Sequence, residues 1–186
     1  EPQIFNTDEH PQPDTTLKCL EQLDGVIGQK STITAGNASG INDGAAALLL
    51  ASADAIDCYH LKPMTRIIAV AASGVSPRLM GIGPVSATHK ALEMAGLDIS
   101  DLDLIEINEA FAAQSIACLR ELGINDDAPH VNPNGGAIAM GHPLGMSGAR
   151  LVLTASYELV RRRGQFALCT MCVGVGQGVA VILETC

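Results

Sequence analysis

Aromatic residues are scarce in this chain of 186 residues, which contains no Trp, two Tyr and three Phe. A buried core must therefore be built from aliphatic side chains, and hydrophobic residues make up 47% of the chain, which is enough to build one. Glycine is frequent, at 19 residues. Aliphatic residues with many glycines are typical of the closely packed helices and strands of α/β proteins, and the length suits one sizeable domain or one domain plus part of another.

Basic residues are also few. Lys and Arg total 11 against 20 Asp and Glu, which gives a formal net charge of -9. The chain therefore lacks the overall positive charge by which proteins hold nucleic acid. The one basic cluster, Arg161–Arg163, falls at the end of a predicted helix, where it complements the helix dipole. We expect no nucleic-acid partner.

Long apolar runs are missing as well. No stretch of about 18 apolar residues predicts a membrane span, and no signal-peptide pattern is present. The six cysteines are scattered in a chain too long to need disulfide support, which favours a reducing, cytoplasmic setting. The first residue is Glu1 rather than Met, as expected of a processed chain or of a fragment that starts mid-protein.

The first third of the chain is irregular. Residues 1–30 are polar and contain several prolines, which predicts a loop-rich segment with one short helix near residues 16–23. The apolar run Ala45–Ala51 has the length of a strand and is bounded by turn residues, so it is predicted as a buried strand, with a helix as the alternative. A helix is predicted over 52–59.

From residue 65 onwards, strands and helices alternate. The predicted strands lie at 66–72, 103–107, 130–132, 166–172 and 179–183, and the predicted helices at 84–95, 109–122 and 147–163. Each helix is followed by a glycine that can end it, namely Gly96, Gly123 and Gly164. The order βαβαβαββ predicts an α/β layered domain with a terminal hairpin at one edge of the sheet.

Asn108 lies between a predicted strand and a predicted helix. In open α/β sheets, ligands bind beyond the carboxyl ends of the strands, so the Asn108 amide could bind a ligand oxygen or a water. Taken by itself, Asn108 is better explained as the residue that caps the N-terminus of the predicted helix.

His142 lies in a loop dense in glycine. Gly135, Gly136, Gly141 and Gly145 surround it, which predicts sharp turns or a close approach to a ligand. The imidazole could act as a base or as a donor to a negatively charged oxygen. The alternative is a structural histidine that binds backbone groups.

Cys172 ends a predicted strand and begins a glycine-rich turn. Its thiol could transfer protons if its surroundings brought its pKa towards neutrality. The alternative is a buried cysteine that serves as a small apolar residue. Cys169 and Cys172 also form a CxxC pair, and together with His142 they allow a zinc or redox interpretation. That interpretation is weaker, because no second cysteine pair is present.

Taken together and in order, these motifs resemble the thiolase family of 3-oxoacyl-CoA thiolases and acetyl-CoA acetyltransferases. The resemblance covers nearly the whole chain and rests on NEAFAAQ at 108–114, NPNGGAIAMGHPLGMSGAR at 132–150, CVGVGQG at 172–178, TAGNASGINDGAAALLLAS at 34–52 and MGIGPV at 80–85. Two further stretches, NTDEHPQPDTTL at 6–17 and DDAPHVNPNGG at 126–136, look most like the degradative branch that acts on 3-oxoadipyl-CoA.

The resemblance implies a thiolase-like layered fold and a CoA-dependent acyl transfer. Thiolases cleave a 3-oxoacyl-CoA with CoA to give an acyl-CoA and acetyl-CoA, or run the reverse Claisen condensation, and CoA is a substrate rather than a cofactor. Cys172 matches the acid/base cysteine of the family, and the backbone N–H of Gly174 matches an oxyanion-hole donor. His142 matches the residue that activates the nucleophile and binds the thioester oxygen, and Asn108 matches the residue that holds a water in the same hole.

The resemblance also implies contacts to CoA and an oligomeric state. The matching positions for CoA are Ala35, Ser39, Ile41, Met80, Ala110 and Phe111. Full-length thiolases form homo-oligomers, and neither a metal, a membrane nor a nucleic acid takes part in the reaction.

One part of the family pattern is missing. The nucleophilic cysteine of thiolases lies in a CxS-type motif that opens a helix, and no such motif occurs here. We therefore expect a fragment that is inactive alone, with residues 1–64 as the tail of the loop domain plus the last elements of the N-terminal domain, and 65–186 as the C-terminal domain. The alternative is a noncatalytic CoA-binding or assembly module. The acyl-chain specificity stays open.

Overall fold

A four-stranded sheet in the order β1-β4-β3-β2 organises the chain from residue 65 to the C-terminus. The strands are β1 (Thr65–Gly74), β2 (Leu104–Ile107), β3 (Phe166–Val173) and β4 (Gln177–Thr185). β4 pairs antiparallel with both β1 and β3, and β2 runs parallel to β3. The terminal hairpin therefore lies at the centre of the sheet, and the expected edge position is wrong. β4 buries residues on both of its faces, and such a strand is stable only between neighbours.

The computed structural model describes residues 4–28 and 31–186. Residues 1–3 and 29–30 of the predicted loop-rich segment lie outside the described part. The described helices are α1 (Leu17–Leu20), α2 (Ala53–Tyr59), α3 (Gly83–Ala95), α4 (Ala112–Glu121), α5 (Ala137–Met140) and α6 (Ser147–Arg162), with 3-10 turns η1 (Pro77–Ile82) and η2 (Ile99–Asp101).

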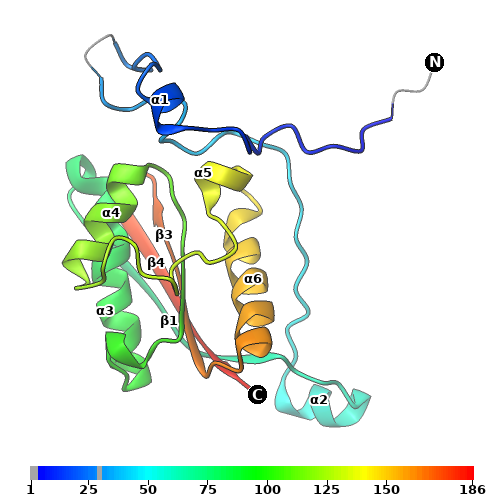
Figure 1. The fold of residues 1–186 in the computed structure, drawn as a ribbon. Coiled ribbons are helices and arrows are strands. Elements are labelled where there is room, and N and C mark those ends of the chain that lie inside the picture. Colours follow the sequence, from blue (N-terminus) through cyan, green and yellow to red (C-terminus); the bar gives the residue numbers. More distant parts are fainter. Residues whose placement is uncertain (1–3, 29–30) are drawn as a thin grey trace.

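Helices cover both faces of the sheet, with α3 and α4 on one side and α6 on the other (Figure 1). Along β2, Ile105 belongs to the core on the α3 side, whereas Leu104 packs with Leu159 on the α6 side. This alternation follows from the two-residue period of a strand. The expected α/β layered class is confirmed.

Most helices begin or end at the residues that the sequence marks. Ser52 caps α2 by accepting the Ala55 N–H, and α3 ends at Gly96, which has a φ of 68°. α4 starts at Ala112 rather than at Glu109, because Phe111 is extended and forms a bridge with Ala38.

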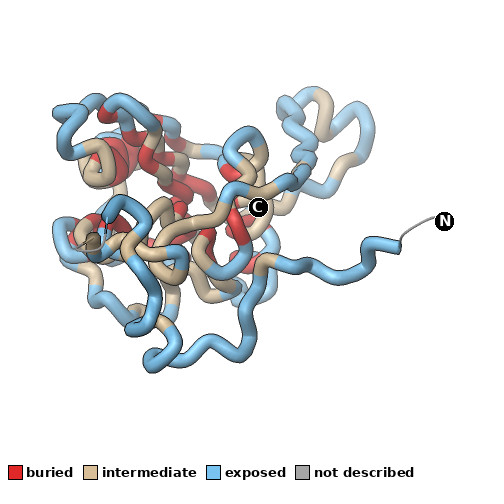
Figure 2. The backbone as a smooth tube through the Cα atoms, turned by 90° about the horizontal axis from the view of Figure 1, so that it is seen from above, coloured by how far each residue is buried: buried red, intermediate tan, exposed pale blue. Residues whose placement is uncertain are grey.

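The predicted strand at Ala45–Ala51 is wrong. Residues 41–52 form neither strand nor helix, and Leu49 and Leu50 are 82% and 73% exposed. The segment runs as an extended trace outside the sheet and leads into α2 (Figures 1 and 2). An apolar run becomes a strand only beside a partner strand, and no strand in the described part of the chain pairs with it.

The predicted strand at 130–132 is reduced to a single bridge between Val131 and Ile105. Asn132 has a φ of 42°, which is outside the strand region. Its side chain replaces the missing backbone pairing: Oδ1 accepts from the Ile107 N–H at 2.8 Å, and Nδ2 donates to the Ile107 carbonyl at 2.9 Å. The amide thus continues the hydrogen bonding of β2 after the backbone has turned away.

Among the helices in residues 4–28 and 31–186, none has the length and apolarity that crossing a membrane would need.

Candidate active site

The loop that carries His142 is tied down by a segment from the N-terminal part of the chain. The His142 backbone N–H donates to the Gly40 carbonyl at 3.1 Å and to Asn42 Oδ1 at 3.2 Å. Gly141, with a φ of 95°, adopts a backbone conformation that favours glycine, and any side chain there would collide with the Asn42 amide. Gly141 therefore serves the turn and its packing.

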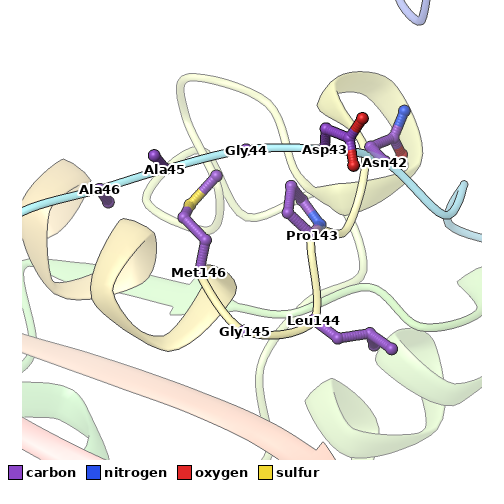
Figure 3. Close-up of a pocket in the computed structure, with 9 residues that line it drawn as sticks. All are labelled: Asn42, Asp43, Gly44, Ala45, Ala46, Pro143, Leu144, Gly145 and Met146. Carbon is purple, nitrogen blue, oxygen red and sulfur yellow. The ribbon is translucent and has the colours of Figure 1, made fainter.

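Figure 3 shows the same segment beside the loop, where residues 42–46 and 143–146 line an open cavity of about 310 Å³. Gly44 lies against Pro143 and Met146, because a side chain at Gly44 would meet both of them. Residues 40–46 thus form a strap across the outside of the His142 loop.

The His142 ring is held at both nitrogens. Nδ1 lies 2.6 Å from Ser147 Oγ, and Ser147 Oγ donates to the Pro143 carbonyl at 3.0 Å. Because the hydroxyl proton goes to Pro143, Ser147 accepts from Nδ1–H, and Nε2 is left with its lone pair. That lone pair faces Asn108 Nδ2 at 3.4 Å.

Asn108 does not cap the helix that follows it. Phe111 occupies the cap position of α4, and the Asn108 N–H donates to the Thr170 carbonyl at 3.0 Å. Only 1% of Asn108 is exposed, and Oδ1 has no partner among the described residues. A buried amide oxygen costs free energy unless it is hydrogen-bonded, so Oδ1 is suited to accept from a water or a ligand.

Cys172 lies at the same edge of the sheet. β2 and β3 are parallel, so Asn108 and Cys172 both come at carboxyl ends of neighbouring strands. Burial raises the pKa of the Cys172 thiol, so its environment does not bring the pKa towards neutrality. At neutral pH the thiol is protonated, and it can give a proton to a strong base such as a carbanion.

The electrostatics at His142 favour a neutral imidazole. Burial lowers the pKa of His142, and the nearby Arg150 cation lowers it further. A neutral ring with a bare Nε2 is the form that can accept a proton.

The CxxC pair does not form a redox or zinc site. Cys169 and Cys172 are both free thiols, and Cys169 faces the α6-side core. Residues three apart on a strand point to opposite faces, so the two sulfurs diverge. Within the described residues, no group of three or more His, Cys, Asp or Glu side chains could hold a metal.

The residues matched to CoA contacts are only partly gathered. Ser39 donates its N–H to the Ala110 carbonyl at 3.1 Å, and Phe111 pairs with Ala38, so these motif segments lie side by side. Met80 lies half-buried in η1. Ala35 is exposed, and 93% of Ile41 is exposed.

Gly174 lies exposed in the turn between β3 and β4, with open space where a side chain would be. Nothing in the described residues therefore requires glycine there for steric reasons.

Several residues around His142 and Asn108 are not singled out by the sequence analysis. They are Asn42, Ser147, Glu106 and Arg150. Glu106 carried a readable signal, since an acid inside the short apolar strand LIEI must be buried and paired. Ser147, at the start of a helix five residues after His142, carried a weaker signal.

Comparison with known proteins gives a consistent result along the chain. Residues 61–185 match the family described as "Thiolase, C-terminal domain", and residues 1–54 match "Thiolase, N-terminal domain". The 3-oxoadipyl-CoA/3-oxo-5,6-dehydrosuberyl-CoA thiolase of Escherichia coli (strain K12) is 64% identical over 177 residues, which cover 95% of this chain and 44% of that protein. The beta-ketoadipyl-CoA thiolase of Pseudomonas putida is 60% identical over 181 residues, covering 97% and 45%.

A solved structure is also similar. Human mitochondrial 3-ketoacyl-CoA thiolase in complex with CoA superimposes with a TM-score of 0.90 at 44% identity, covering 99% of this chain and 46% of that one. This chain therefore spans less than half the length of the relatives that it matches. The family matches, the identities and the shared fold lead to one conclusion: the chain belongs to the thiolase family.

Proposed function

We propose that this chain supplies the proton-transfer and oxyanion-binding groups of a thiolase reaction. In that reaction a 3-oxoacyl-CoA is cleaved by CoA into an acyl-CoA and acetyl-CoA, or the reverse condensation occurs. The observation that carries the proposal is the His142 imidazole, held at Nδ1 by Ser147 at 2.6 Å and facing Asn108 at Nε2. This pair lies at the sheet edge where β3 ends at Cys172 and Val173.

The proposed cleavage requires hydrogen-bond donors of the kind that His142 and Asn108 can provide. When the bond between C2 and C3 of the substrate breaks, its electron pair passes to the acetyl-CoA half as an enolate, whose negative oxygen needs preorganised donors. His142, once it has taken the proton of the nucleophilic thiol on Nε2, is such a donor. A water held by Asn108 Oδ1 is a second donor.

Cys172 moves the remaining protons. Its thiol gives a proton to the enolate carbon, and the resulting thiolate then takes a proton from the thiol of the incoming CoA. The CoA sulfur attacks the acyl group on the nucleophilic cysteine, which is released as a thiolate. The raised pKa of Cys172 suits the second step, because a thiolate that is costly in a buried site readily takes a proton back.

The substrate that we propose is 3-oxoadipyl-CoA or a similar dicarboxylic acyl-CoA. The support is the printed activity of relatives that are 64% and 60% identical to this chain. Ser39, Met80, Ala110 and Phe111 would border the path of the pantetheine, together with Ala35 and Ile41, and the backbone N–H of Gly174 would serve the second oxyanion. We also propose a homo-oligomer for the complete enzyme.

The nucleophile in this proposal comes from outside these 186 residues, because none of the six cysteines has the expected CxS-type context. A test protein joins this chain to the part of the Escherichia coli relative that precedes the matched region. We expect CoA-dependent cleavage of 3-oxoadipyl-CoA, and a loss of about 10²–10⁴-fold in kcat for His142→Ala and for Cys172→Ala.

The controls separate catalysis from binding. Cys169→Ala, which removes the other thiol of the CxxC pair, should keep most of the activity. If either His142→Ala or Cys172→Ala turned over substrate at the parent rate, the assigned roles would be wrong. If the joined protein were inactive and the isolated chain still bound CoA in calorimetry, the results would instead favour the noncatalytic CoA-binding module.

A further inference from the structure

The most deeply buried charged side chain near the site is Glu106, whose side chain is 0% exposed. It lies on β2 and faces α6, as do Leu104 before it and Asn108 after it. Glu106 Oε2 accepts from Arg150 Nη1 at 2.8 Å, and Arg150 lies in the first turns of α6. No step of the proposed reaction uses this ion pair.

The pair closes a ring of contacts through the site. Ser147 and Arg150 are three residues apart on α6 and therefore lie on one face of the helix. Ser147 binds His142 Nδ1, and His142 Nε2 faces Asn108 Nδ2. Asn108 and Glu106 are two residues apart along the same stretch of chain, so they lie on the same face of the sheet. The ring thus joins β2 and α6 once through the ion pair and once through the two site residues.

We propose that the Glu106–Arg150 ion pair is a positioning device that fixes the start of α6 against β2 and so holds the Asn108 and His142 side chains in contact. The proposal rests on the proposed function for its purpose, since it assigns the pair to the same site. Glu106 and Arg150 are positioning residues, because each acts through a neighbour rather than on the substrate.

The apolar contacts between α6 and β2 do not fix this arrangement. Leu104, Leu151 and Leu159 are among the side chains that make them. Apolar burial is not directional, so it leaves the helix free to shift by small amounts along the strand. A charged hydrogen bond from a planar guanidinium fixes distance and angle together.

Stability is a poor explanation for the pair. Taking two charges out of water costs so much that apolar residues of similar size often replace a buried ion pair without loss. The cost is visible here, because burial raises the pKa of Glu106 to about 7 although the Arg150 cation lowers it. Glu106 Oε1 also has no partner among the described residues.

The test reads the protonation pattern of the His142 ring in the intact chain. Imidazole nitrogen chemical shifts measured by NMR report which ring nitrogen carries the proton, and His142→Asn identifies the signal among the five histidines. The parent should show a proton on Nδ1. The variants are the apolar double replacement Glu106→Met with Arg150→Met, and Arg150→Lys, which keeps the cation but loses the planar fork.

We expect the double variant to unfold at nearly the parent urea concentration, while the ratio of the Nδ1–H form to the Nε2–H form falls about tenfold, as for the loss of one ordinary hydrogen bond. Arg150→Lys, which keeps the charge and is the safer variant for folding, should give an intermediate ratio. A parent-like ratio in either folded variant would overturn the proposal.

The matched control is Glu158→Gln. Glu158 is a buried carboxylate on the same helix that binds Arg161 and Arg162 at the far end. Its loss should lower the urea midpoint and leave the His142 ratio unchanged, and a changed ratio would mean that any weakening of α6 suffices. None of these measurements requires turnover. They can therefore contradict the positioning role of the ion pair without contradicting the proposed reaction, and the reverse also holds.

Discussion

At the scale of the residue, His142 depends on three separate stretches of the chain. Asn42 accepts from its backbone N–H, Ser147 fixes Nδ1, and Asn108 faces Nε2. Each contact removes one freedom: the position of the loop, the tautomer, and the rotation of the ring. An isolated imidazole in water has none of these constraints, so its Nε2 would be a base without a fixed direction.

Val175 stores backbone strain next to the site. It lies in the turn after Cys172 with a φ of 67°, which is rare for a β-branched residue, and 81% of it is exposed, so no packing compensates. Asparagine tolerates this conformation, so Val175→Asn should raise the free energy of unfolding by about 1 kcal/mol in urea denaturation.

Val160 provides the comparison, because it is also exposed but lies within α6. Val160→Asn should bring no gain. A Val175→Asn variant that is less stable than the parent would show that the turn is not strained.

The sequence singles out part of the proposed site for a clear reason. Asn108, His142 and Cys172 each stand beside glycines or at an expected strand end, so local pattern alone singles them out. Asn42 meets His142 across a sequence separation of 100 residues, and no local pattern encodes that contact. The tautomer of His142 likewise depends on the Ser147 hydroxyl, whose direction is set only by the folded first turn of α6.

At the scale of the element, the sequence predicts well those helices and strands whose ends are marked by capping residues or glycines. α3 ends at Gly96, α2 is capped by Ser52, and the β3–β4 hairpin turns at its glycines. The failures are segments whose state depends on a partner. Residues 45–51 have no strand beside them, and the run at 130–132 ends where the Asn132 side chain takes over the pairing.

The C-terminal end of α6 has a pH-dependent anchor. Glu158 binds Arg161 by hydrogen bonds, which are the main reason that its pKa falls from the usual value to about 2; Asn134 and Arg162 also lower it. A carboxylate with a depressed pKa stabilises the fold above its unfolded pKa, near 4.5, and this contribution is lost as the pH falls towards 2.

Glu158→Gln should therefore lower the free energy of unfolding by about 1–2 kcal/mol at pH 7, with a difference that shrinks steadily between pH 4.5 and pH 2. Denaturation in urea over this pH range measures it. Glu121→Gln, which changes an exposed carboxylate on α4, should leave the free energy of unfolding at pH 7 close to that of the parent. A Glu158→Gln deficit of equal size at pH 2 and pH 7 would contradict the electrostatic explanation.

At the scale of the whole molecule, residues 47–51 form a run of exposed apolar residues. Its large side chains are Leu48, Leu49 and Leu50. Contiguous apolar surface of this kind promotes association. The isolated chain should therefore associate as its concentration rises, as measured by sedimentation velocity, and Leu49→Ser with Leu50→Ser should shift it towards the monomer.

Leu17→Ser removes a single exposed leucine in α1 and should leave the association unchanged. A parent chain that stays monomeric up to its solubility limit would show that the exposed apolar segment does not promote association.

The division of the chain into two domains at residue 64 stays a prediction, and residues before that boundary make contacts with residues after it. Residues 37–42 fall in the stretch that matches the N-terminal thiolase domain, yet they bind both the Asn108 and the His142 loops. Part of the proposed site is therefore built from the segment that matches the N-terminal thiolase domain.

The strap over the His142 loop has a consequence for the order of folding. The β3–β4 hairpin joins neighbours in the chain, whereas Ser39 meets Ala110 across 71 residues and Asn42 meets His142 across 100. Closing a long loop costs more entropy than closing a short one, so distant contacts form later. We therefore expect the β3–β4 hairpin to form first, and both the strap contacts and the pairing of β1 with β4, which joins Thr65 to Thr185, to form later. On warming, the exposed strap, which hydrogen bonds tie to the His142 loop, would open before the sheet melts. That state keeps its secondary structure and has already lost the arrangement around His142.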